Sequence, residues 1–295
     1  MSTRLQSSSN VASSSDVVGF INATLRPDSS ISVAADSPLL FEQGPNSLRR
    51  VVTAGDGSPI AHAAARIDSY SSRGRTSTFA VIGAVATSTE HRQQGLATVV
   101  LEDLISDLAL RGVDFAVLWS DVADFYERFG FARSGRELLC EVPTRLFHVE
   151  KGCLVRKAEP EDLPRIAAIH SREPCHVIRT ESMWRAHFGI PGCDFYVLES
   201  FGSVEGYAVV GKGHDLSGCL HEWSTPSNHV TSLVGGVTRL RRDKSLWLMS
   251  APWKESMLAP FAALGLQVHE GVLGMVRPIS GALPEDFYLF GLDSN

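Results

Sequence analysis

The sequence predicts an α/β fold of two domains, and three observations lead to it. The chain has 295 residues, and at roughly 100–200 residues per domain this length favours two domains. Short apolar strands alternate with segments of helical periodicity, as is typical of α/β proteins. The order of these elements in the first half recurs in the second without obvious sequence identity, which indicates duplication. We therefore expect two units, at 16–148 and 149–295, each a mixed twisted β-sheet flanked by helices.

The first predicted unit contains one helix that is much clearer than the others. Apolar side chains recur every four residues from Leu96 to Leu108, and Arg111 and Gly112 end the pattern. The strands on both sides of this helix are apolar on both faces and are predicted to be buried. The expected elements are a helix capped by Ser15 or Asp16, strands at 47–57 and 58–72, a buried strand at 76–87, the helix at 94–110, a buried strand at 113–120, a short helix at 122–129 and a strand at 131–142.

The second predicted unit repeats this order of elements. Its closing strand is preceded by a short helix, as in a duplicated sheet-and-helix layout. The expected elements are a strand, turn and helix at 153–170, strands at 195–200, 205–213 and 218–226, a helix at 229–240, a strand at 245–252, a short helix at 257–266 and a strand at 271–279.

Composition excludes several classes of protein. The net charge is −6 and no long basic run is present, which argues against nucleic-acid and anionic-membrane partners. Residues 1–15 are Ser-rich and polar, so we expect a disordered tail rather than a signal peptide. The five cysteines are odd in number and form no CxxC pair, which predicts reduced thiols, no disulfide framework and no metal site. A cytoplasmic protein fits these features best.

The most informative stretch runs from Val85 to Thr98, where a buried strand ends, a polar turn follows and a helix begins. A helix start presents unpaired backbone N–H groups and the positive end of the helix dipole, which together bind a pyrophosphate. Gly95 lets the backbone approach the phosphates, and Arg92 can add a charge-assisted hydrogen bond. The alternative is an ordinary strand–turn–helix connection. The residues predicted to bind the phosphates are Arg92, Gln93, Gln94, Gly95, Leu96, Ala97 and Thr98.

Two segments of the chain resemble the GNAT superfamily of acyl-CoA-dependent N-acetyltransferases. The first GNAT signature, R/Q-x-x-G-x-G/A on a helix after a strand ending in V-x-V or V-A, is matched by Arg92–Ala97 after Val85–Thr87. The second, N/S-x-x-A-x-x-F/L-Y-x-x-x-G-F, is matched in register by Ser120–Phe131. The resemblance implies two GNAT-like domains, with acetyl-CoA as the co-substrate of the first.

The resemblance also implies a role for each matched residue. Tyr126 would donate a proton to the departing CoA thiolate, because a phenol is still protonated at neutral pH. Backbone groups of the strand end Val85-Ala86-Thr87 would hydrogen-bond the pantetheine arm, and the Val85 N–H would stabilise the oxyanion. Ser120 would lie near the pantetheine or, alternatively, cap a helix. The alternative for Tyr126 is a core tyrosine with a satisfied hydroxyl.

The chain departs from the GNAT pattern in one important respect. The strand at 79–87 has no acidic residue, so the base that accepts the amine proton is not identified. A water chain or a loop carboxylate such as Glu42 could serve. The tandem layout resembles the enhanced-intracellular-survival type of acetyltransferase without its C-terminal domain. That resemblance implies that Asp293 or the carboxylate of Asn295 is the base. Alternatively, the apolar C-terminal segment merely seals the junction between domains.

The second unit is expected to bind no CoA, because residues 224–229 lack the glycine pattern of the turn. His221 and Glu222 lie on an apolar strand and could line an acceptor pocket, although a satisfied buried pair is the alternative.

The predicted function is acetyl transfer from acetyl-CoA to a primary amine of a small molecule or peptide, by direct attack in a ternary complex. The alternatives are a non-catalytic acyl-CoA-binding sensor and a transferase for a longer acyl-CoA.

Overall fold

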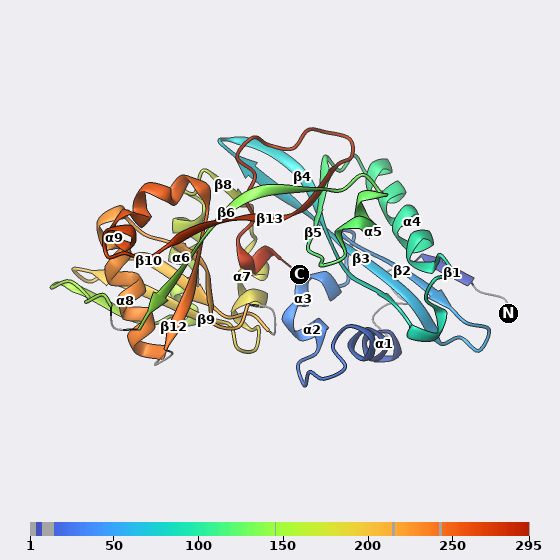
Figure 1. The fold of residues 1–295 in the computed structure, drawn as a ribbon, viewed down its shortest axis with the longest axis horizontal. Coiled ribbons are helices and arrows are strands. Elements are labelled where there is room, and N and C mark those ends of the chain that lie inside the picture. Colours follow the sequence, from blue (N-terminus) through green and yellow to red (C-terminus); the bar gives the residue numbers. More distant parts are fainter. Residues whose placement is uncertain (1–3, 8–14, 145, 214–215, 242–243, 295) are drawn as a thin grey trace. The chain divides into compact units, whose positions relative to one another are not determined.

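The computed structural model describes residues 4–7, 15–144, 146–213, 216–241 and 244–294. The chain forms two compact units. Unit 1 comprises residues 1–134, 274–285 and 294–295, and unit 2 comprises residues 135–273 and 286–293. Each unit has a mixed β-sheet with helices packed on it, which confirms the predicted fold class (Figure 1). None of the helices in the described part of the chain has the length and apolarity needed to cross a bilayer.

The sheet of unit 1 has the strand order β1-β2-β3-β4-β5-β13. Neighbouring strands are antiparallel except β4 and β5, which are parallel. Parallel strands need a crossover connection, and α4 supplies it. The strands are β1 (Arg4–Ser7), β2 (Ser47–Thr53), β3 (Pro59–Ser72), β4 (Arg75–Thr87), β5 (Phe115–Leu118) and the end of β13 (Val268–Pro278).

Helices cover both faces of this sheet. Consecutive residues of β2 point to opposite faces of the sheet: Val52 packs with α4, whereas Val51 packs with α1 and α2. In β3, alternate apolar residues from Ala61 to Ile67 join the α4 cluster. The helical elements are α1 (Ser15–Leu25), α2 (Val33–Asp36), α3 (Pro38–Phe41), the 3₁₀ turn η2 (Thr89–His91), α4 (Leu96–Leu110) and α5 (Ala123–Glu127).

The N-terminal segment differs from the expected disordered tail. Residues 4–7 form strand β1, which pairs antiparallel with Arg50–Thr53 of β2. The polar composition of the tail hides this strand, because an edge strand gains its backbone hydrogen bonds whatever its side chains are. Residues 1–3 and 8–14 lie outside the described residues.

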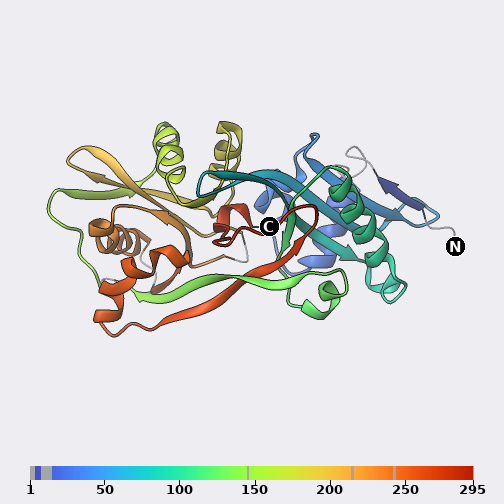
Figure 2. The same cartoon turned by 90° about the horizontal axis from the view of Figure 1, so that it is seen from above.

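Unit 2 has the strand order β13-β6-β12-β11-β10-β9-β7. Helices α6 and α7 lie on one side of this sheet, and α8 and α9 lie on the other (Figure 2). The strands are β6 (Ala132–Pro143), β7 (Cys153–Lys157), β8 (Cys175–Val177), β9 (Asp194–Ser200), β10 (Ser203–Val210), β11 (Cys219–Ser224), β12 (Ser245–Ser250) and most of β13. The helical elements are η3 (Pro160–Asp162), α6 (Leu163–His170), α7 (Glu181–Phe188), η4 (Ser227–His229), α8 (Val230–Arg241), η5 (Pro252–Leu258), α9 (Ala259–Ala263) and η6 (Gly291–Asp293).

The division between the units differs from the predicted boundary at residue 148. Strand β6 passes into unit 2 at Gly135, where it pairs with β12 from Leu138 to Pro143. The last residues of β13, Met275–Pro278, belong to unit 1 and pair with β5. Both strands carry similar apolar alternation, and that pattern says which face of a strand is buried but not which sheet it joins.

One carboxyl group in the core of unit 2 makes stability depend on pH. Glu137 of β6 is 8% exposed and accepts a hydrogen bond of 3.0 Å from the Tyr288 hydroxyl. Burial raises the pKa of Glu137 from 4.5 to about 7. A raised pKa contributes stability below pH 4.5 that is lost as the pH rises through about 7. Ionising this carboxyl in the folded protein therefore costs up to about 3 kcal/mol by pH 8.

We expect Glu137→Gln to remove that cost. The free energy of unfolding of the variant should exceed that of the wild type by more at pH 8 than at pH 5, with an increase of up to about 3 kcal/mol. Urea unfolding of both proteins at the two pH values measures it. Glu141→Gln, at an exposed position of the same strand, is the control and should show no such gain. A pH-independent difference between Glu137→Gln and the wild type would contradict the shifted pKa. Comparison within each pH also cancels the opposite contributions of His62 and His221, whose pKa values burial lowers to about 4.

Candidate active site

The parallel strands β4 and β5 separate after a short ladder. They pair from Phe79 with Phe115 to Val81 with Val117, and β5 ends at Leu118. Strand β4 continues to Thr87, with Ala84 in the left-handed region at φ 50° and a register shift against β3 at the same level. The last residues of β4 therefore have no β5 partner, so their backbone N–H and C=O groups on that side can bind an extended ligand.

The turn after β4 has the backbone that an anion site requires. Gln93 and Gly95 have positive φ values of 63° and 76°. Gly95 is the N-cap of α4, with no side-chain hydrogen bond at the cap, and a side chain at this position would point into open space. The helix starts at Leu96 rather than at the predicted Gln94, because these left-handed residues cannot continue it. The first N–H groups of α4 consequently have no partner within the helix.

A cavity of about 430 Å³ opens at this helix start. It gathers seven of the predicted ligand-binding residues: Thr87, Arg92, Gln93, Gly95, Leu96, Ala97 and Thr98. It also contains three that the sequence did not indicate as ligand-binding: His91, Phe125 and Arg128. Val85, Ala86, Gln94, Ser120 and Tyr126 are not among the residues that line it.

Arg128 adds a second positive charge to the cavity. Its guanidinium lies over the Phe125 ring, 4.9 Å from the ring centroid. Arg128 occupies a position at which the second motif allows any residue, so the motif did not predict that Arg128 would line the cavity. A useful signal would have been helical spacing, because Arg128 lies three residues after Phe125 and one turn of helix brings such side chains together.

Tyr126 lies on α5 with its ring in the core of unit 1. It is 7% exposed and packs edge-on against Phe125 and Phe131. Burial raises its pKa above the ordinary value, and a hydrogen bond with Ser120 opposes this in part. The Ser120 hydroxyl also accepts a hydrogen bond of 3.1 Å from the Val122 N–H, as a cap would. The phenol is thus held in its protonated form, which a general acid needs.

A family model matches part of unit 1. Residues 40–134 match the model of the acetyltransferase (GNAT) domain. No curated protein sequence matches the chain.

Solved structures resemble nearly the whole chain. A probable N-acyltransferase of unknown function from Enterococcus faecalis is 15% identical, with a TM-score of 0.75 over 95% of this chain and 73% of that one. Eis1 from Mycobacterium abscessus is 18% identical, with a TM-score of 0.65 over 95% and 74%. A tandem GNAT protein from the clavulanic acid biosynthesis pathway is 12% identical, with a TM-score of 0.59 over 96% and 100%. At such identities these likenesses concern the fold, and they confirm the tandem layout.

Two of the buried polar atoms of unit 1 that lack a hydrogen-bond partner in the described part of the chain bear on this site. One is the Thr87 hydroxyl, in the wall of the cavity. The other is Nε2 of His62 on β3, a residue that the sequence did not indicate. Nδ1 of His62 lies 2.7 Å from the Ala84 carbonyl oxygen, so it carries the hydrogen and leaves Nε2 as an acceptor. Burial lowers the pKa of His62 to about 4, so the ring is neutral at pH 7.

The residues predicted as candidate bases are Asp293, Asn295 and Glu42, and the two that the structure describes, Asp293 and Glu42, are not among the residues that line the cavity. Asp293 belongs to unit 2, is fully buried, and accepts hydrogen bonds of 2.9 and 2.6 Å from Arg179. Asn295 lies outside the described residues. Glu42 is exposed at the end of α3. The carboxylate of Asp293 is thus already engaged by a guanidinium in the core of unit 2.

Unit 2 has a strand, a turn and a helix in the same order, at β11, η4 and α8, but without the glycine turn. His221 and Glu222 of β11 are fully buried. Arg179 donates two hydrogen bonds to Glu222, and the Tyr207 hydroxyl donates a third. Nε2 of His221 lies 3.0 Å from the Gly211 carbonyl oxygen. This favours the interpretation of Glu222 as a satisfied core residue over an acceptor pocket.

Proposed function

We propose that unit 1 transfers an acetyl group from acetyl-CoA to a primary amine. The observation that carries the proposal is the cavity of about 430 Å³ at the uncapped start of α4, beside the free end of β4. Helix N–H groups, Arg92 and Arg128 offer it the positive potential that a pyrophosphate needs. The unpartnered Thr87 hydroxyl offers a hydrogen bond at the same wall. These residues fit a CoA ester better than a neutral ligand.

The pantetheine arm would extend along the end of β4 that β5 leaves unpaired. Backbone groups of Val85 and Thr87 would replace the missing ladder, with Ala86 between them. The thioester would then lie near the irregular backbone at Ala84. His62 hydrogen-bonds to that backbone, which places a neutral acceptor nitrogen beside the same segment.

The chemistry proposed is direct attack in a ternary complex. The amine nitrogen bonds to the thioester carbon, and the Val85 N–H stabilises the oxyanion that forms. The carbon–sulfur bond then breaks, and Tyr126 gives its proton to the CoA thiolate. Nε2 of His62 accepts a hydrogen bond from the amine and orients its lone pair. With a pKa of about 4 the ring is a weak base, so the amine proton passes to water.

A charge change at Gly95 tests the phosphate-binding turn. Gly95→Asp is expected to weaken acetyl-CoA binding at least tenfold relative to Gly95→Asn, measured by calorimetry. The two side chains have similar size, and both tolerate the positive φ of this position better than other residues do. Only the aspartate places a negative charge where the pyrophosphate would lie. Equal affinities for the two variants would refute the turn as the phosphate site.

An acceptor screen tests the function itself. The protein is incubated with acetyl-CoA and pools of primary amines, and the release of free CoA thiol is followed. Amine-dependent release supports the transferase. Binding of acetyl-CoA without release for any amine favours the sensor, and release only with longer acyl-CoA esters favours the other alternative.

A further inference from the structure

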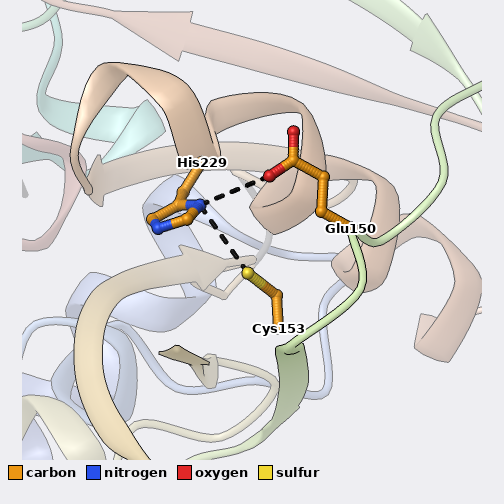
Figure 3. A group of neighbouring side chains, drawn as sticks. All are labelled: Glu150, Cys153 and His229. Carbon is orange, nitrogen blue, oxygen red and sulfur yellow. Dashed lines mark hydrogen bonds and ion pairs between the residues drawn. The ribbon is translucent and has the colours of Figure 1, made fainter. Parts of the chain in front are cut away.

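Three side chains of unit 2, of types that can bind a metal, converge in the structure although His229 is far in the sequence from Glu150 and Cys153. The Sγ atom of Cys153 lies 3.6 Å from Nδ1 of His229, 76 positions away. A carboxylate oxygen of Glu150 lies 3.7 Å from the same nitrogen. The three ligand atoms lie within 4.8 Å of one another, and Figure 3 shows the thiol and carboxylate pointing at one side of the imidazole. Such spacing leaves room for one small cation between them.

We propose that unit 2 binds one zinc ion through Glu150, Cys153 and His229. Tetrahedral zinc with bonds of about 2.3 Å to sulfur and about 2.0 Å to nitrogen or oxygen separates S from N by about 3.5 Å and N from O by about 3.3 Å. The separations in the structure, 3.6 Å and 3.7 Å, lie within about 0.4 Å of these values. A thiolate and an imidazole favour zinc over magnesium or calcium, which prefer oxygen ligands. On binding, the Cys153 thiol loses its proton to solvent as the sulfur–zinc bond forms.

Local backbone structure brings two of the ligands together. The Cys153 N–H donates to the Glu150 carbonyl at 3.1 Å, which closes a four-residue turn. Gly152 in this turn has φ 92°, a conformation that glycine adopts without strain. The Glu150 N–H donates to the Ser232 hydroxyl of α8, which ties the turn to the helix next to His229. The turn therefore holds the thiol and carboxylate on the same side before any metal binds.

The charges around the cluster also suit a divalent cation. Thiolate and carboxylate together balance the two positive charges of zinc. A carboxylate oxygen of Glu205 lies 3.5 Å from Nε2 of His229, the nitrogen that would not bind the metal. A carboxylate at this position fixes the tautomer and increases the basicity of a zinc-binding histidine. The Glu150 side chain is 54% exposed, so the fourth coordination position faces solvent and takes a water molecule.

Cobalt substitution tests the site. The full chain, stripped with a chelator, is titrated with Co²⁺, which occupies zinc sites and absorbs in the near ultraviolet when bound to thiolate. We expect one equivalent to produce this band and one equivalent of Zn²⁺ to remove it. Cys153→Ser and His229→Gln should lose the band. Cys219→Ser, at another partly buried cysteine of unit 2, should keep it. Glu205→Gln should bind zinc about tenfold more weakly.

A second measurement keeps the proposal testable if a variant fails to fold. In the wild type, Zn²⁺ should protect one thiol from a disulfide reagent, and peptide mapping should identify it as Cys153. The proposal is overturned if the wild type gives no thiolate–cobalt band, if the band persists in Cys153→Ser, or if zinc protects no thiol.

Discussion

Tyr126→Phe is expected to lower the turnover of acetyl transfer by about a hundredfold or more and to leave acetyl-CoA affinity nearly unchanged. The thiolate that leaves the tetrahedral intermediate needs a proton, and the variant removes only the hydroxyl that would supply it. The ring stays in place, because Phe125 and Phe131 pack against its faces and edges. Stopped-flow or steady-state thiol release gives the turnover, and calorimetry gives the affinity.

A matched substitution separates this role from packing. Tyr70 of β3 is a fully buried tyrosine of the same unit, in ring contact with Phe79 and Phe115, so Tyr70→Phe should keep its turnover. Because burial raises the pKa of Tyr126, the wild-type rate should not fall through loss of this proton until the pH exceeds the ordinary tyrosine value of 10.0. Normal turnover of Tyr126→Phe would make Tyr126 a core residue and assign the proton to another donor.

The part of the site that the sequence predicted is the part that local chain geometry determines. A buried strand, a turn with Gly95 and an amphipathic helix are neighbours along the chain, so their order alone puts a helix start beside a strand end. The apolar spacing from Leu96 to Leu108 identified the helix, and Val100, Leu104 and Leu108 are indeed fully buried. The exact start could not be predicted, because it depends on the left-handed backbone at Gln93 and Gly95.

The residues that sequence reasoning missed depend on partners that are distant along the chain. His62 was missed because its role depends on the Ala84 carbonyl of the neighbouring strand, which binds Nδ1 of the ring and leaves Nε2 unpaired. No periodicity signals this, since a histidine in an apolar strand reads as an ordinary core residue. Likewise, Cys153 and His229 meet only because β7 packs beside the start of α8. The spacing of cysteines therefore predicted no metal site.

The composition of the chain end predicted that it packs, but not what this packing does. The apolar residues from Phe287 to Leu292 predicted a packed segment rather than a frayed one, and all of them except Gly291 are buried apolar side chains. The role of the packed segment depends on which cation pairs with Asp293. In the structure that cation is Arg179, on the chain segment just before α7. This ion pair leads to the second large prediction.

Arg179→Leu is expected to destabilise the protein by about 3–5 kcal/mol at pH 8. The guanidinium is fully buried and donates to both oxygens of Glu222 and both oxygens of Asp293. Burial alone would lower its pKa, but the two carboxylates raise it well above the ordinary value. Removing it leaves two carboxylates in the core of unit 2 without a cation. Urea unfolding measures the loss.

The loss should depend on pH in a direction that identifies its cause. Burial raises the pKa of Glu222, but Arg179 more than offsets this and holds it well below the ordinary value. Without Arg179, burial dominates, so Glu222 is protonated in the folded variant at a higher pH than in the unfolded chain. The variant's deficit relative to the wild type is thus largest at pH 8 and smaller at pH 5. A deficit that is the same at both values would indicate lost packing, for example against Trp184, rather than unpaired charge.

Arg185→Leu is the control for this experiment. Arg185 lies six residues further on, in α7, with its side chain 71% exposed and paired to Glu181, so its loss should change stability by less than about 1 kcal/mol. If Arg179→Leu were equally mild, the buried ion cluster would not hold the chain end. If it is severe, the Asp293 carboxylate is bound in the fold of unit 2, which favours loss of the amine proton to water over its transfer to the chain end. His62→Phe, assayed for turnover at saturating acetyl-CoA, then tests the orienting role proposed for His62, because His62 alone among the residues described beside β4 presents a buried, unpaired acceptor nitrogen.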